Sequence, residues 1–221
     1  MASLAERLKI ETRALHTVAE RSRFMALLLR GRMERPAYCA LLRNLHPVYA
    51  ALEPALARHS RHPVIAPVYV PALARTEALG QDLRWLHGAG WAEAIDVLPA
   101  AARYVQRLRE LDATKPALLL AHAYVRYLGD LSGGQMLRRI VAASLRLEHG
   151  AGTMFYDFGE TGETLATAFR AGLGQVVVDA GGVDALVAEA VFAFEQHGRL
   201  FDELALAHGL AEDQQAAPAA P

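Results

Sequence analysis

The stretch from Tyr124 to Ile140, YVRYLGDLSGGQMLRRI, has apolar residues at helical spacing but contains Gly129, Gly133 and Gly134. Each glycine costs about 0.8–1.0 kcal/mol relative to alanine inside a helix, so a helix over this stretch forfeits roughly 3 kcal/mol. At 100° per residue, Gly129 and Gly133 lie within about 40° of each other, which leaves bare backbone along one helix face. We predict a helix whose backbone is approached closely by another helix or by a flat ligand.

The same letters allow other interpretations. A glycine pair can simply end a helix, because glycine is common just beyond a helix C-terminus. Residues 131–135 spell LSGGQ, the signature of ABC-transporter ATPases, but those enzymes also need a GxxxxGK[ST] loop, which neither Lys9 nor Lys115 completes. The GLG at 172–174 lacks the third glycine and the preceding strand of a dinucleotide site. We therefore find no nucleotide or flavin site.

Helical spacing also dominates the rest of the chain, because period-2 alternation never persists. Further helical patterns are separated by breaker clusters and cover residues 3–29, 36–57, 72–87, 99–112, 116–148, 161–178 and 183–208. Pro47 and Pro54 predict a kink or break in the second of these, and the proline-rich residues 62–71 predict an irregular, extended connector. We expect one all-α domain over residues 1–208 and a disordered tail over 209–221.

The composition narrows the class of protein. The 221 residues are 53% hydrophobic and carry a net charge of −1, so no basic surplus indicates a nucleic-acid partner. The single cysteine, Cys39, excludes an internal disulfide or Cys-cluster metal site and fits a reducing, cytoplasmic compartment. No apolar run reaches 18 residues, and the N-terminus has no apolar core of a signal peptide, so we expect neither a membrane span nor export.

A polar stripe follows one flank of the first predicted helix. Lys9, Arg13, His16 and Glu20 are spaced i, i+4, i+7 and i+11, which places them within about 60° of one another. The apolar positions of the same helix lie on a different side: Leu4, Leu8, Leu15 and Val18. The stripe suits a metal-bound imidazole beside cations that await an anionic group. A solvated face with ordinary i,i+4 pairs is the alternative, and the pattern alone favours it.

Two segments together carry a resemblance to a known family. LKIETRALHTVAE at 8–20 and AHAYVRYLGDLSGGQML at 121–137 closely resemble the two haem-clasping helices of the haem oxygenase family. The likeness covers roughly residues 5–205. It implies a single multi-helix domain, with haem sandwiched between a proximal N-terminal helix and a glycine-rich distal helix. It also implies oxidative opening of the haem macrocycle, by O2 and external electrons, to biliverdin, carbon monoxide and ferrous iron.

The resemblance also implies roles for individual residues. His16 matches the proximal ligand of the haem iron, and Glu20 matches the carboxylate near that ligand's other ring nitrogen. The three glycines at 129, 133 and 134 match backbone that passes over the macrocycle. Asp130 matches the carboxylate that organises distal waters for proton delivery, with Tyr49 and Arg126 in the same polar network. The groups that match the haem propionate edge are Lys9, Arg13, Arg170 and Tyr124.

The resemblance also concerns partners. The resemblance implies that haem is both substrate and cofactor, and that the electrons come from a separate donor, a ferredoxin, a flavodoxin or an NAD(P)H reductase. That expectation agrees with the missing flavin and nicotinamide motifs. Iron release and biliverdin supply to a photoreceptor are both open as the purpose. The alternative function is a non-catalytic haem-binding or haem-transfer protein, which would have no need of Asp130 as a proton relay.

The sequence departs from the family pattern at two positions. A basic position near the propionates is Ala166 here, and an asparagine of the last helix is His197, so the meso carbon that is cut is not assigned. Four apolar residues either line the pocket or belong to the ordinary core, and helical spacing favours the core: Phe24, Met25, Phe194 and Phe201. We expect Cys39 to be a small, buried hydrophobic residue. The remaining histidines have no ligand spacing and are expected to be structural or exposed: His46, His59, His62, His87, His122, His149 and His208.

Overall fold

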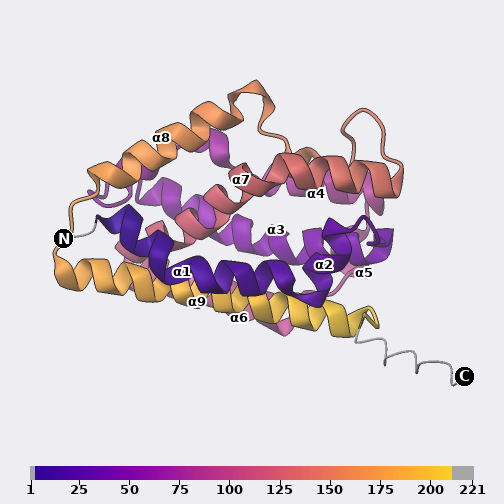
Figure 1. Ribbon diagram of the computed structural model, residues 1–221, viewed down its shortest axis with the longest axis horizontal. Helices are drawn as coiled ribbons and strands as arrows, with labels where there is room; N and C mark the ends of the chain where they lie inside the picture. The colour runs from indigo at the N-terminus through magenta and orange to yellow at the C-terminus, as the bar shows by residue number, and fades with distance from the viewer. Residues whose placement is uncertain (1–2, 211–221) are drawn as a thin grey trace, which may run out of the picture.

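The computed structural model describes residues 3–210, apart from the side chain of Glu160, and these residues form helices and no strand. The helices are α1 (Leu4–Arg21), α2 (Arg23–Leu29), α3 (Arg35–Arg58), α4 (Thr76–Leu86), α5 (Trp91–Ala94), α6 (Pro99–Thr114), α7 (Leu119–Leu145), α8 (Gly162–Gln175) and α9 (Ala180–Ala207). Figure 1 shows α1 lying along α9, with α7 running obliquely across the molecule toward its upper edge. The predicted all-α fold is confirmed.

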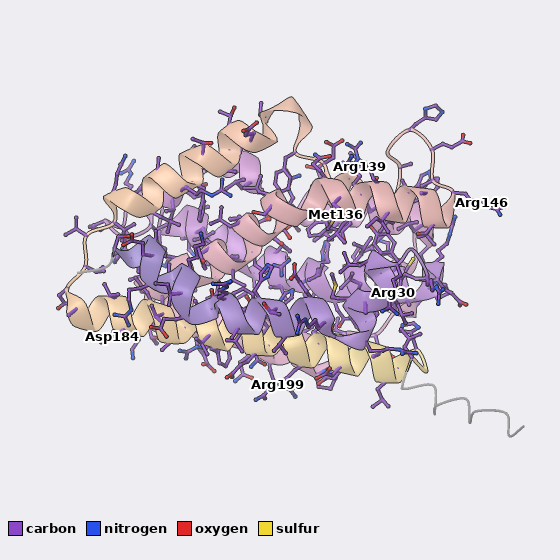
Figure 2. All side chains as sticks on the ribbon, in the orientation of Figure 1. Arg30, Met136, Arg139, Arg146, Asp184 and Arg199 are labelled. Atoms are coloured by element: carbon purple, nitrogen blue, oxygen red, sulfur yellow. The ribbon has the colours of Figure 1, made fainter. Side chains whose placement is uncertain are left out.

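The first helix begins at a capping box. The Ser3 hydroxyl accepts a hydrogen bond from the Glu6 N–H at 3.3 Å, and the Ser3 N–H donates to the Glu6 carboxylate at 2.8 Å. At the same end, Arg7 donates to Asp184 of α9 at 3.1 Å, and Figure 2 labels this aspartate near the start of that helix. These contacts fix the direction in which α1 leaves its start and lies on α9.

The buried side of α1 is narrower than the sequence predicts. Of the apolar positions named from the sequence, Leu4 and Leu8 are buried, but Val18 is 65% exposed. Thr12 is buried instead, and its hydroxyl donates to the Leu8 carbonyl oxygen at 2.7 Å, which satisfies it within the helix. The second half of α1 therefore presents more of its surface outward than a fully packed helix would.

The predicted break in α3 is absent, because the helix runs without interruption through Pro47 and Pro54. Each proline costs about 3 kcal/mol inside a helix. Pro54 and Ala50 are both exposed, so water can reach the Ala50 carbonyl that Pro54 leaves without a donor. Several large side chains of α3 are fully buried, and each contributes about 1.5–3 kcal/mol, which together outweigh the prolines: Tyr38, Leu42, Tyr49 and Leu52.

The connector over residues 62–71 forms no strand, as predicted, but it is less extended than expected. It includes the short 3-10 segment Ala66–Val68 and continues into a second one, Pro71–Leu73. It lies directly on α8, because a Cβ at Gly172 would overlap the Pro67 carbonyl oxygen. Glycine at 172 thus permits a close backbone crossing. The sequence analysis did not predict the short α5, which begins at the last residue of the breaker cluster over residues 88–91.

Three further predictions concern the C-terminal end of the chain, the burial of Cys39 and the absence of a membrane-spanning helix. Leu210 donates its N–H to the Ala205 carbonyl at 2.8 Å and so closes α9, while residues 211–221 of the predicted tail lie outside the described residues. Cys39 is buried, which confirms the prediction that this cysteine lies in the core. Within residues 3–210, no helix is both long and apolar enough to cross a membrane.

Candidate active site

The first component of the site is an imidazole on α1. Nδ1 of His16 lies 3.5 Å from the Glu20 carboxylate one helical turn later, so the predicted i,i+4 pair is present. The Phe194 ring of α9 packs edge-on against the His16 ring, with 6.0 Å between ring centroids. The side chain is nevertheless 53% exposed, and Nε2 has no protein partner among the described residues. His16 is therefore oriented on one side and available on the other.

The second component is bare backbone on α7. A Cβ built at Gly129 or at Gly133 would meet no atom within 4 Å, so both glycines border open space. Gly134 differs, because a Cβ there would lie 3.4 Å from the Tyr156 carbonyl oxygen. Two of the three predicted glycines thus share an open helix face, and the third packs against the 3-10 segment Met154–Tyr156.

These two components belong to one region of the molecule. α2, α8 and α9 each pack against both α1 and α7. Tyr124 of α7 also interacts through its hydroxyl with the Thr12 side chain, one turn before His16 on α1. Burial raises the pKa of Tyr124 despite that hydrogen bond, so the hydroxyl stays protonated at neutral pH. Tyr124 therefore lies where α1 and α7 approach each other.

The third component is a buried polar network that contains the predicted distal residues. Asp130 is 7% exposed and accepts hydrogen bonds from the Arg126 guanidinium at 3.0 Å and from the Tyr49 hydroxyl. Arg126 also donates from Nε to the Tyr49 hydroxyl at 2.9 Å. A further hydrogen bond runs from Nη1 of Arg126 to Nε2 of His197 on α9. The structure thus brings together the three predicted residues and adds a fourth.

Burial and charge oppose each other in this network. Burial raises the pKa of Asp130, and the nearby Arg126 cation and Tyr49 hydroxyl only partly offset that rise. Burial would lower the pKa of Arg126, but Tyr49 and Asp130 outweigh it, so the guanidinium remains charged. A buried carboxyl group with a raised pKa takes up a proton more readily than an exposed one. Asp130 has the environment of a proton-transfer group.

A second buried cluster lies beside the first. His122 bonds through Nε2 to Glu189 at 3.0 Å and through Nδ1 to the Tyr104 hydroxyl at 3.1 Å. Arg107 donates two hydrogen bonds to the same Glu189 carboxylate, at 2.6 and 3.0 Å. Burial lowers the pKa of His122, whereas the hydrogen bonds from His122 and Arg107 outweigh burial and lower that of Glu189 to about 2. The cluster therefore pairs an ionised Glu189 with a neutral His122.

The predicted propionate cations lie on two adjacent helices. Lys9 and Arg13 are on α1 and Arg170 is on α8, and these helices pack together. All three side chains are exposed and form no ion pair within the described part of the chain. Ala166, at the position where relatives carry a basic residue, is buried on α8. The positive charge available to an anionic group therefore comes mainly from α1 and from Arg170.

Sequence reasoning missed part of this site. Phe194, for which the core was the favoured of two interpretations, lies half-buried against His16. Four residues of the two buried networks were not predicted as partners: Tyr104, His122, Glu189 and His197. The departure of His197 from the family pattern was the one available signal. Two cavities of about 260 and 340 Å³ lie elsewhere, between α3 and the end of α9, and are lined by none of the predicted site residues.

Comparisons with known proteins agree on one family. A model of the heme oxygenase family matches residues 2–203. Heme oxygenase 1 of Nostoc sp. is 40% identical over 91% of this chain and 86% of its own length, and human heme oxygenase 1 is 39% identical over 91% and 71%. The crystal structure of heme oxygenase-1 from Synechocystis sp., in complex with heme, superposes with a TM-score of 0.87 at 35% identity, covering 95% of this chain and 97% of that one.

An all-α domain with an available imidazole on one helix and bare backbone on another has groups that suit a haem-binding fold. With the whole-length matches, it follows that the chain belongs to the haem oxygenase family. The protein is an enzyme, and its reaction is the oxidative opening of haem to biliverdin, carbon monoxide and ferrous iron.

Proposed function

We propose that haem binds between α1 and α7, with His16 as the axial ligand of its iron. The supporting observation is the pairing of two features on helices that share the same neighbours: an imidazole whose Nε2 has no protein partner, and a stretch of backbone that borders open space. The Nδ1 contact with Glu20 suits a ligand, because a carboxylate on one ring nitrogen fixes the tautomer that leaves the other free to bind metal.

The remaining residues fit the shape and charge of haem. Haem is flat, largely apolar and doubly anionic, so its site needs close backbone and a few cations. Gly129 and Gly133 supply the backbone, since neither carries a side chain that would separate the helix from the ring. The exposed cations of α1 and α8 are free to pair with the propionates: Lys9, Arg13 and Arg170.

When bound, haem supplies both the iron at which O2 is activated and the ring that is oxidised. The protein's own part on the distal side is to hold and move protons. The Asp130 carboxylate is buried and occupied by Arg126 and Tyr49, so it acts on the open side of α7 through water rather than by direct contact. Its raised pKa suits a group that donates a proton and is recharged from solvent.

The electrons come from a separate protein in this proposal, because the sequence has no flavin or nicotinamide motif. A ferredoxin, a flavodoxin or an NAD(P)H reductase fills that role. A cytoplasmic location fits the single, buried, unpaired thiol of Cys39, since disulfides are rare in that compartment.

Replacement of the proposed ligand tests this assignment. We expect the wild-type protein to bind one equivalent of ferric haem with the absorption and resonance Raman signature of an imidazole ligand. His16→Ala should lose that signature, and added imidazole should restore it. His149→Ala is the matched control, because that histidine is 95% exposed on a loop. A His16→Ala complex that keeps the wild-type spectrum would place the iron ligand elsewhere.

A further inference from the structure

The buried guanidinium of Arg126 has three hydrogen-bonded partners from three different elements. Nε donates to Tyr49 of α3, Nη2 donates to Asp130 of α7, and Nη1 donates to His197 of α9. Tyr49 and Asp130 also bond directly to each other, so these two partners form a closed group with Arg126. His197 stands outside that group and contacts it only through Arg126. The hydrogen bond to His197 is therefore what holds the Arg126 guanidinium on the side that faces α9.

The contact with Arg126 favours the neutral form of His197. A guanidinium can only donate hydrogen bonds, so the ring nitrogen that faces it must accept and carry no proton. Burial and the Arg126 cation both lower the pKa of His197 well below its usual value. The other rings against it are Tyr104 of α6, at 6.2 Å between centroids, and Phe201 of α9, at 5.3 Å. Neither is an anion, and the Asp130 carboxylate is already occupied by Arg126 and Tyr49.

We propose that His197 is a positioning residue for the distal carboxylate: as a neutral imidazole it holds Arg126 between Tyr49 and Asp130, and its protonation releases Arg126 from that position. This inference rests on the proposed role of Asp130 in proton transfer. An imidazolium would present an N–H to another N–H and place two cations side by side in a buried site. Arg126 would then have to move, and the hydrogen bond that orients Asp130 would move with it.

The consequence is a distal site that is sensitive to acid through a residue whose hydrogen bond is to Arg126 rather than to His16. Asp130 should keep its productive orientation above the pH at which His197 protonates, and lose it below. The rate of haem opening should therefore fall on the acid side with a contribution from His197. Haem affinity should change little, because the propionate cations and His16 are separate from this contact.

Two substitutions distinguish the role of His197 as a hydrogen-bond acceptor from the effect of its protonation. His197→Gln places a neutral amide oxygen at about the reach of Nε2, so it can accept from Arg126 but cannot be protonated. His197→Leu removes the acceptor. We expect His197→Leu to lower the single-turnover rate of bilin formation by about tenfold, with haem affinity within about twofold of wild type. His197→Gln should recover most of that rate and should flatten the acid decline, which sets in well below pH 6.5 because the pKa of His197 is lowered in the folded protein.

A measurement without haem gives an independent readout. Because the pKa of His197 is lower in the folded than in the unfolded protein, the unfolded state takes up its proton first, below about pH 6.5. The wild-type apoprotein should therefore lose stability between pH 6.5 and pH 5, and His197→Gln should lose less. His46→Gln is the matched control, since burial also lowers the pKa of His46 but its ring packs against Trp91, outside the network. That control should alter the stability profile and leave the acid decline of the rate unchanged.

The outcomes are distinguishable. Wild-type rate in His197→Leu, or an unchanged acid decline in His197→Gln, would overturn the positioning role. A wild-type protein that binds haem but never forms bilin would overturn the proposed function instead, while the apoprotein profiles would still report whether His197 is held neutral. A His197→Leu protein that fails to fold would leave the His197→Gln pH profile as the deciding result.

Discussion

Gly129 and Asp130 are consecutive residues of α7 that face different sides of the helix. A Cβ at Gly129 would meet no atom within 4 Å, whereas the Asp130 side chain is buried and bonds to Arg126 at 3.0 Å. Neighbouring helix residues point about 100° apart, so one residue opens the ligand face and the next anchors the network behind it. The carboxylate is thereby close to the open face without occupying it, which is what proton delivery through water requires.

Asp130→Asn tests that arrangement. The amide keeps the shape of the side chain and can still accept from Arg126, but it cannot hold the transferable proton. We expect haem affinity to be retained and the rate of bilin formation to fall by about 100-fold or more, as for loss of a general acid. Stopped-flow absorption under single-turnover conditions measures both quantities. Asp112→Asn is the control, because Asp112 pairs with Arg58 and His59 away from the site. A wild-type rate in Asp130→Asn would remove Asp130 from the mechanism.

Gly133→Ala should have opposite effects on the protein with and without haem. The new methyl group meets nothing in the apoprotein, so the apoprotein should become more stable by about 1 kcal/mol, the usual gain of alanine over glycine in a helix. The same methyl group would occupy the space proposed for haem, so haem affinity should fall. Thermal unfolding and haem titration measure the two effects. In Gly134→Ala the methyl group would lie against Tyr156, and haem affinity should stay near wild type. Equal affinities in the two variants would argue against haem over this face.

Glu189 should govern the acid stability of the fold. Its pKa is lowered from 4.5 to about 2, so its ionised form stabilises the folded state fully above pH 4.5, and that contribution is lost as the pH falls toward 2. Glu189→Gln should therefore cost on the order of 3 kcal/mol at pH 7, because it leaves His122 and Arg107 without their anion, and much less near pH 2.

Urea unfolding at several pH values measures this difference. Glu11→Gln is the control, since the exposed Arg7–Glu11 pair should contribute no more than about 0.5 kcal/mol. A Glu189→Gln protein as stable as wild type at pH 7 would show that the buried cluster contributes nothing net to folding.

The local part of the site could be predicted from the sequence. His16 and Glu20 are four residues apart on a helix, so their contact follows from helical spacing, and the shared open face of Gly129 and Gly133 follows in the same way. Gly134 is directly adjacent, yet it faces Tyr156, because the next residue of a helix turns away from the one before it. The spacing of residues in the sequence predicts which of them share a helix face, but it does not predict which neighbouring segment packs against that face.

The rest depends on contacts between distant segments. His197 bonds to Arg126 across 71 residues, and Glu189 bonds to His122 across 67, so no local pattern indicates either pair. The same reasoning explains α3, where local rules favour a break at Pro47 and Pro54. Burial of the helix against several neighbours outweighs that preference, and this burial is visible only once the chain is folded.

The most direct test of the central claim is to add one equivalent of ferric haem to the purified protein, supply a reductant in air, and follow the visible spectrum. We predict loss of the Soret band with growth of a red-absorbing bilin and release of one carbon monoxide per haem. A haem complex that cycles between its oxidised and reduced forms and keeps its Soret band would contradict the account, because it would show a protein that binds haem without opening it.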